Sequence, residues 1–221
     1  MLLVCGGIKG GVGKTTLATN MAILRSQQGR DVLLVDADDQ ATASDFTAVR
    51  HQTLADQGGT GYTAIKLHGA AVRAELLRMK DKYEDVVIDV GGRDTAGQRA
   101  ALSIADVYVV PFLPGSFDVW TLETVAQLVE ETRAFNDHFL AYCCINRADP
   151  RGSDNAEAAA IALETPNLTY IDAPLGNRKA FRTAAAQGLA VTELKSRDRD
   201  DKAIAEIMRL YKYLFKVDMT S

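Results

Sequence analysis

The sequence predicts an α/β fold in which a doubly wound, mostly parallel sheet carries helices on both faces. Short apolar runs, each the length of a strand buried on both faces, recur along the 221 residues. Stretches with apolar residues at helical spacing separate these runs, and a glycine-rich turn joins the first run to the first helix. We therefore expect one domain spanning residues 1–221, a length sufficient for a single core.

The apolar runs define the expected strands: 2–8, 32–35, 86–90, 107–112 and 140–145. The expected helices lie between and after them: 14–28, 70–80, 118–135, 153–163, 177–187 and 200–215. The first ends at Gly29, which suits a helix C-terminus, and Ser153 or Asp154 is a suitable N-cap for the fourth. The helix over 118–135 carries a helical stripe: Trp120, Val125, Leu128 and Val129.

The polar, glycine-rich segment 48–69 is expected to be the least regular part of the chain. It holds His51 and His68, which are far apart, and we interpret them as surface residues rather than metal ligands. The three cysteines have no metal-ligand spacing, and Cys5, Cys143 and Cys144 lie in apolar runs. Together with a start that lacks a basic region, they favour a cytoplasmic protein with reduced, buried thiols and no signal peptide.

Charge is spread unevenly along the chain. Residues 1–177 hold 15 Lys and Arg against 23 Asp and Glu, whereas residues 178–216 hold 10 against 5. A basic C-terminal part is typical of a surface that contacts nucleic acid or another anionic partner, and equally of a solvated helical face with mixed charge.

The most specific pattern lies between the first strand and the first helix: Lys9, Gly10, Gly11, Val12, Gly13, Lys14, Thr15 and Thr16. A glycine-rich turn at a helix N-terminus points backbone N–H groups at one place, which binds phosphate. Lys14 can reach the β- and γ-phosphates, and the Thr15 hydroxyl can hold Mg²⁺. This P-loop predicts binding of a nucleoside triphosphate, although Ile8 replaces the usual first glycine and Lys9 is an added lysine.

Polar residues also follow three other expected strands. Asp36, Asp38 and Asp39 follow the second strand, and Asp89 ends the third in the Walker B manner, before Gly91 and Gly92. Strand ends meet at the ligand-binding edge of an open α/β sheet. Asn146, just past the fifth strand, carries an amide that could read a nucleobase edge. In isolation Asp38-Asp39 could be a surface turn and Asn146 a cap, but their order relative to the P-loop favours a site.

These motifs resemble the deviant-Walker-A ATPases of the ParA/MinD superfamily, especially the short ParA-type partition ATPases. The P-loop run matches the family signature, and Asp36 to Gln40 resembles its Asp-x-Asp-Pro-Gln segment, with Asp39 where proline is usual. The strand and loop over residues 83–92 resemble the Walker B strand and switch, and the late stretch from Arg178 to Glu193 is similar to the family's C-terminal pattern.

The resemblance implies a role for each matching residue. Lys9 would cross a dimer interface to the phosphates bound by the other subunit, and residues 9–16 with Asn146 would bind ATP. Lys14 would be the ordinary P-loop lysine, and Asp38 would orient the attacking water. Thr15, Asp36 and Asp89 would support Mg²⁺. Because position 39 carries Asp instead of the family's usual proline, the backbone next to Asp38 is less constrained than it would be with proline.

Three functions remain open. The first is an ATP-driven positional switch: an ATP-bound homodimer binds nonspecific DNA at the nucleoid, and a ParB-like or other adaptor stimulates hydrolysis and release. Its DNA surface would use the basic residues of the C-terminal part: Arg178, Lys179, Arg182, Lys195, Arg197, Arg199 and Lys202. The second is a MinD-like switch whose last helix binds membrane, although we prefer that helix packed on the sheet. The third is a metabolic P-loop kinase or ligase, against which no second cluster of reactive residues is evident.

Overall fold

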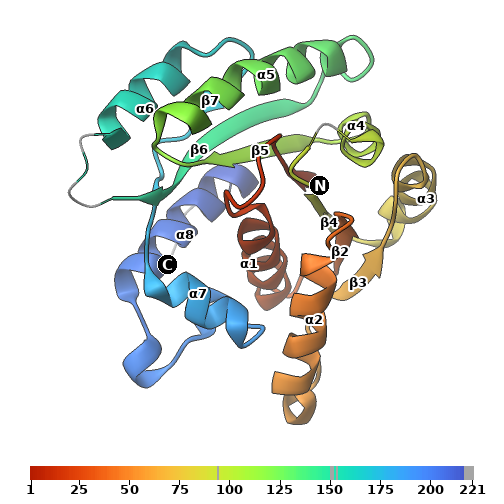
Figure 1. Ribbon diagram of the computed structural model, residues 1–221. Coiled ribbons are helices and arrows are strands. Elements are labelled where there is room, and N and C mark those ends of the chain that lie inside the picture. Colours follow the sequence, from red (N-terminus) through yellow and green to blue (C-terminus); the bar gives the residue numbers. More distant parts are fainter. Residues whose placement is uncertain (94, 150–151, 153, 217–221) are drawn as a thin grey trace.

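The computed structural model describes residues 1–93, 95–149, 152 and 154–216 (Figure 1). One sheet has the strand order β3-β2-β4-β1-β5-β6-β7, with β8 paired to β6, and every pairing among the described residues is parallel. The order reverses on either side of β1, which is the doubly wound arrangement that the sequence predicts. The predicted fold class is confirmed.

The strands are β1 (Leu2–Cys5), β2 (Val32–Ala37), β3 (Thr63–Lys66), β4 (Asp85–Val90), β5 (Val107–Phe112), β6 (Leu140–Ala148), β7 (Thr169–Tyr170) and β8 (Leu175–Gly176). The α-helices are α1 (Lys14–Gln27), α2 (Thr42–Thr53), α3 (Ala71–Met79), α4 (Ala96–Leu102), α5 (Ser116–Arg133), α6 (Asp154–Glu164), α7 (Lys179–Ala186) and α8 (Asp201–Phe215). Short 3-10 helices are η1 (Ala55–Gln57), η2 (Lys80–Lys82), η3 (Val191–Glu193) and η4 (Ser196–Asp198).

Each central strand is buried on both faces because it feeds two separate cores. Along β1, Leu2 and Val4 join one core, while Leu3 and Cys5 join the other. This alternation follows from the two-residue period of a strand. Helices α3, α4, α5 and α6 cover the first face, and α1, α2, α7 and α8 cover the second (Figure 1). The three cysteines are buried as free thiols, as expected.

The segment expected to be irregular is more ordered than its composition indicates. Residues 48–69 hold the end of α2, the helix η1 and the edge strand β3. Only Ala43, Phe46 and Arg50 of α2 are buried, so its apolar pattern is weak, and β3 is mostly exposed. Helix α4 and the two-residue strands β7 and β8 were also not predicted, because segments this short carry little periodicity.

Two further expectations change in detail. Strand β1 ends at Cys5 rather than at residue 8, because the chain turns into the P-loop at Gly6. Val125, Leu128 and Val129 of α5 are buried, but Trp120 is 63% exposed and stands outside the stripe. Ser153, one of the two expected caps of α6, lies outside the described residues.

Helix α8 packs its apolar face onto the sheet. Ile207, Leu210, Tyr211 and Leu214 are at most 2% exposed, so the residues that could have formed a membrane-binding face are part of the core. Among the described helices, none combines the length and apolarity that crossing a bilayer requires. The preferred interpretation of the last helix is therefore confirmed.

Candidate functional site

The P-loop runs from the end of β1 to the start of α1, which begins at Lys14. Gly13 precedes the helix with φ 99°, and a Cβ there would lie 2.1 Å from the Asn146 amide nitrogen. The position therefore excludes every residue except glycine, for both conformational and steric reasons. The result is a helix N-terminus with open N–H groups facing the carboxyl edge of the sheet, which is the predicted phosphate site.

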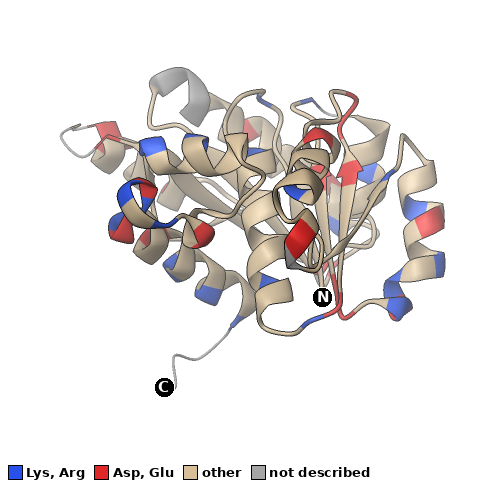
Figure 2. Cartoon of the chain, turned by 90° about the horizontal axis from the view of Figure 1, so that it is seen from below, with Lys and Arg blue, Asp and Glu red and all other residues tan. Residues whose placement is uncertain are grey.

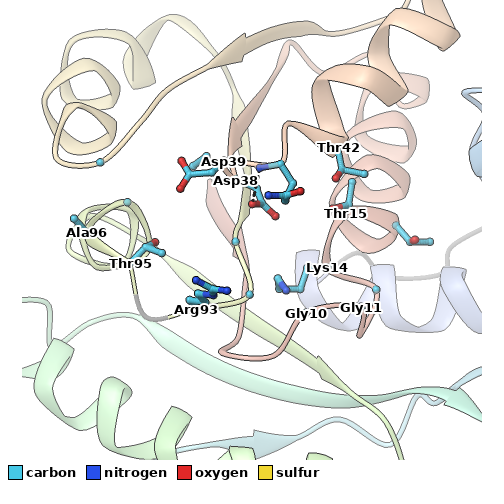
Figure 3. A pocket seen from close by; sticks show the side chains of 18 of the residues that line it. Gly10, Gly11, Lys14, Thr15, Asp38, Asp39, Thr42, Arg93, Thr95 and Ala96 are labelled. Atoms are coloured by element: carbon cyan, nitrogen blue, oxygen red, sulfur yellow. Dashed lines mark hydrogen bonds between the residues drawn. The ribbon is translucent and has the colours of Figure 1, made fainter.

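A cavity of about 820 Å³ lies directly against this turn. Its lining includes Gly10, Gly11, Gly13, Lys14, Thr15, Thr16 and Asp38 from the sequence-predicted site. Figure 3 shows Lys14 and Thr15 on one side of it, with Asp38 and Asp39 reaching in from the end of β2. The structure thus brings three separately predicted segments, from β1, β2 and β4, to one place.

Lys14 is buried and donates from Nζ to the backbone oxygen of Lys9, 2.8 Å away. Burial lowers the pKa of Lys14 below its usual value, although the negative charges of Asp89 and Asp38 oppose that shift. The ammonium is therefore held inside the loop of amides that would surround a phosphate.

Thr15 and Asp89 form the predicted metal-binding pair. The Thr15 hydroxyl donates to Oδ2 of Asp89 at 2.6 Å, and Asp89 is fully buried. Burial raises the pKa of Asp89 to about 7, and Asp36 and Asp38 add to the shift while Thr15 and Lys14 oppose it. Oδ1 of Asp89 is buried and lacks a hydrogen-bond partner among the described residues. A buried, unpartnered carboxylate oxygen beside a threonine hydroxyl fits Mg²⁺ or one of its waters.

Asp36 and Asp38 differ in the hydrogen bonds that they form within the chain. Oδ2 of Asp36 accepts from the backbone N–H and the hydroxyl of Ser44, both at 2.7 Å, and Oδ1 accepts from the N–H of Asp38 at 3.2 Å. Through these hydrogen bonds, Asp36 at the end of β2 anchors the first turn of α2. Asp38 lines the cavity, and its Oδ1 accepts from the N–H of Gln40 at 3.1 Å.

Three predicted nucleotide-binding residues are not among the residues that line the cavity. Val12 is buried, and its carbonyl accepts from Nδ2 of Asn146 at 2.6 Å. The Asn146 side-chain oxygen accepts from the N–H of Arg147 at 2.9 Å, so both ends of this amide hold the P-loop and the end of β6. Lys9 is half-buried, and the cavity-lining set does not include it.

Gly91 and Gly92, which the sequence places just after the Walker B strand, also line the cavity, and the structure adds lining residues that sequence reasoning missed, among them Gly69, Arg93, Thr95 and Arg147. Arg93 and Arg147 each follow a motif that the sequence does reveal, the Walker B strand and the strand ending at Asn146. Arg147 has φ 54° at an irregularity in the pairing of β6 with β8, and it lines the cavity. Their position directly after those motifs is the sequence feature that could have identified both arginines as site residues.

The predicted DNA-binding residues lie on α7, α8 and the segment between them. Figure 2 shows basic and acidic residues interleaved over this part of the chain. Arg178 is committed to Glu206, with Nε–Oε2 at 2.8 Å and Nη2–Oε1 at 2.5 Å, and Arg199 pairs with Asp201 at 2.8 Å. The other predicted cations are exposed and have no ion pair among the described residues: Lys179, Arg182, Lys195, Arg197 and Lys202.

Comparisons with known proteins agree with this geometry. A family model described as the CobQ/CobB/MinD/ParA nucleotide-binding domain matches residues 3–191. The chain is 27% identical over 198 residues to the maintenance of carboxysome distribution protein A of Halothiobacillus neapolitanus, covering 89% of each chain. It is 31% identical over 194 residues to the protein of the same name from Gloeobacter kilaueensis, covering 86% of this chain and 83% of that one.

The fold also matches a solved structure of a Cyanothece McdA variant in complex with ATP. The TM-score is 0.80 at 18% identity, and the match covers 100% of this chain and 98% of that one.

Proposed function

This chain belongs to the CobQ/CobB/MinD/ParA nucleotide-binding family, and we propose that it is an ATP-dependent positioning ATPase. The observation that carries the proposal is the convergence of Lys14, the Thr15–Asp89 pair and Asp38 on one cavity. Two relatives that match most of the chain are named for the distribution of carboxysomes, which favours positioning over metabolism.

Hydrolysis needs a held triphosphate and an oriented water. The amides of the P-loop and the ammonium of Lys14 would bind the phosphates, and Thr15 and Asp89 would hold Mg²⁺. The metal would neutralise charge that develops on the phosphoryl oxygens. Asp38 lies on the opposite side of the cavity and would orient water toward the terminal phosphate, while Asp36 would act indirectly by fixing the backbone of Asp38. Asn146 is bonded to Val12 and Arg147 here, and it would read the adenine edge after its amide turns away from these partners when nucleotide binds.

We assign Lys9 to a neighbouring copy of the chain. Its carbonyl holds Lys14, whereas its side chain is not part of the cavity wall of its own chain. In a twofold dimer around two nucleotides, each Lys9 would supply a cation to the other subunit's phosphates, as an arginine finger does. Hydrolysis would then depend on dimerisation.

The ATP-bound dimer would bind DNA without sequence preference through the five exposed cations named above. Phosphate contacts of this kind supply affinity but no base readout. An adaptor would stimulate hydrolysis and separate the dimer, and the cargo would be a plasmid, a chromosome or a protein assembly. The cell compartment would be the cytoplasm at the nucleoid.

The test is ATP-dependent binding of the wild-type chain to nonspecific duplex DNA across a salt series. We expect binding with Mg²⁺ and a non-hydrolysable ATP analogue, none with ADP, and a steep loss of affinity as salt rises. Anionic liposomes in place of DNA provide the comparison with a MinD-like membrane switch, and ATP turnover without any acceptor provides the comparison with a kinase or ligase.

Two variants test the dimer. Lys9→Ala should abolish hydrolysis and leave the folded monomer intact, and Asp38→Ala should accumulate as an ATP-bound dimer on DNA. Size exclusion of Asp38→Ala with ATP that shows only monomer would contradict the switch.

A further inference from the structure

Arg93 is a cavity-lining cation to which no role has yet been given. It follows β4 by three residues, is exposed, and lines the same cavity as Lys14 and Gly10. Figure 3 shows its guanidinium extending into the cavity from the loop after β4, with Lys14 and Gly10 on the other side. The positive charges of Arg93 and Lys14 therefore face the same cavity.

The backbone that carries Arg93 is held against the P-loop. A Cβ on Gly92 would lie 2.7 Å from the backbone nitrogen of Gly10 and 2.9 Å from the carbonyl carbon of Lys9. Gly92 therefore packs directly on the turn that would surround the phosphates, and this contact leaves no room for a side chain. Arg93, the next residue, therefore starts beside the P-loop turn at the phosphate end of the cavity.

Arg93 has no competing partner within the described part of the chain, where it forms neither an ion pair nor a side-chain hydrogen bond. The two acidic residues among the described cavity lining have contacts of their own: Asp38 accepts from the N–H of Gln40, and Asp39 lies 3.4 Å from His68. By contrast, the partly buried Arg25 and the buried Arg50 are each paired with a carboxylate. An exposed guanidinium that faces a phosphate site and has no carboxylate partner is suited to an anionic ligand.

We propose that Arg93 is a phosphate-binding residue that contacts the terminal phosphate of the nucleotide held by its own chain. The inference rests on the proposed ATPase function. Thr15 and Asp89 would hold Mg²⁺ beside the phosphates, and Arg93 lies four residues beyond that carboxylate, in a loop that contacts the P-loop. Arginine offers several N–H donors in a plane that matches phosphate oxygens, and its charge persists at any working pH.

The consequence is discrimination between nucleotides. Lys14 and the P-loop amides would bind ATP and ADP alike, whereas Arg93 would add a contact that only the triphosphate provides. The chain would then favour ATP before any second subunit arrives with Lys9.

The test is the affinity of Arg93→Gln for a fluorescent non-hydrolysable ATP analogue and for the matching ADP derivative, both with Mg²⁺. Arg73→Gln is the matched control, because Arg73 is exposed on α3, has no ion pair among the described residues and lies outside the cavity. We expect Arg93→Gln to weaken binding of the ATP analogue roughly ten- to a hundred-fold, the range for a charged hydrogen bond, and to change ADP affinity less than about threefold. Arg93→Lys should recover part of the loss.

Measurements are made where sedimentation shows the wild type to be a monomer, and thermal melting confirms that the variants fold. Equal affinity of Arg93→Gln and wild type for the ATP analogue would overturn the inference. So would an equal loss for both nucleotides, or a loss seen only at concentrations where the wild type dimerises. A wild type that binds neither nucleotide would instead overturn the proposed function.

Discussion

The phosphate end of the cavity and the basic C-terminal surface are both predicted to bind phosphate, and they are built in opposite ways. At the cavity, Gly13 and Gly92 lie so close to neighbouring atoms that a Cβ on either residue would collide with them. On the surface, cations such as Lys179 and Lys202 extend into solvent beside carboxylates. The first site depends on geometry and the second on charge, so substitutions should differ in the size and kind of their effects.

The largest effect should come from adding one methyl group at Gly92. Gly92→Ala places a Cβ 2.7 Å from the Gly10 nitrogen, and backbone cannot yield as a flexible side chain would. We expect about a hundred-fold or greater loss of affinity for the ATP analogue by fluorescence titration, because the phosphate-binding loop must shift.

Gly97→Ala is the matched control for that prediction. Gly97 also lines the cavity, but its Cβ would meet only ordinary contacts at 3.6 Å or more. Similar affinities of the two variants for the ATP analogue would show that the cavity tolerates an added methyl group. The phosphate site would then not depend on close backbone packing, contrary to the contrast with the basic surface.

The next effect concerns Asp89 and pH. Its pKa of about 7 lies above the ordinary value of 3.8, so between these values the folded state keeps a proton that the unfolded state has lost. Stability without metal should therefore fall as pH rises through this interval. Asp89→Asn removes that penalty and should be more stable than wild type at pH 8 by on the order of 4 kcal/mol, with little difference near pH 4.

Denaturant unfolding at the two pH values, without Mg²⁺, checks the Asp89 prediction. Because Mg²⁺ displaces the proton, wild-type metal affinity should also rise with pH up to about 8. A stability difference that does not change between pH 4 and pH 8 would contradict the assignment.

A smaller effect separates Arg178 from the other basic residues. Its guanidinium holds Glu206, which also accepts from the Gly176 N–H at 3.0 Å, so Arg178→Gln leaves a part-buried carboxylate without its charge partner. We expect a loss of about 1–2 kcal/mol in unfolding free energy and little change in the salt dependence of DNA binding. A large change in that salt dependence would show that Arg178 contacts DNA, as the sequence predicts.

The smallest effect should come from Lys202, which is exposed and has no ion pair among the residues that the structure describes. Lys202→Gln should leave stability within about 0.5 kcal/mol of wild type. It should lower the slope of log affinity against log salt by about 0.9 if one phosphate contact is lost. An unchanged slope would remove this residue from the proposed surface.

Much of the site could be predicted because its motifs are local. The P-loop, the Walker B carboxylate and the polar ends of β2 and β6 each lie within a few residues of an apolar strand. Helix α2, helix α4 and strand β3 escaped prediction because they bury few apolar residues. Arg93 escaped because an arginine after two glycines is indistinguishable, in sequence, from any exposed loop cation.

By itself the sequence determined the parallel α/β fold, the glycine turn ahead of α1 and the order of the polar strand ends, since spacing along one chain sets each of these. Only the tertiary structure decided which groups meet. Thr15 bonds to Asp89 across 74 residues, Asn146 reaches Val12 across 134, and Gly92 rests on Gly10. The physical reason is that parallel strands place their carboxyl ends at one edge, so the contacts depend on strand order, which spacing does not encode.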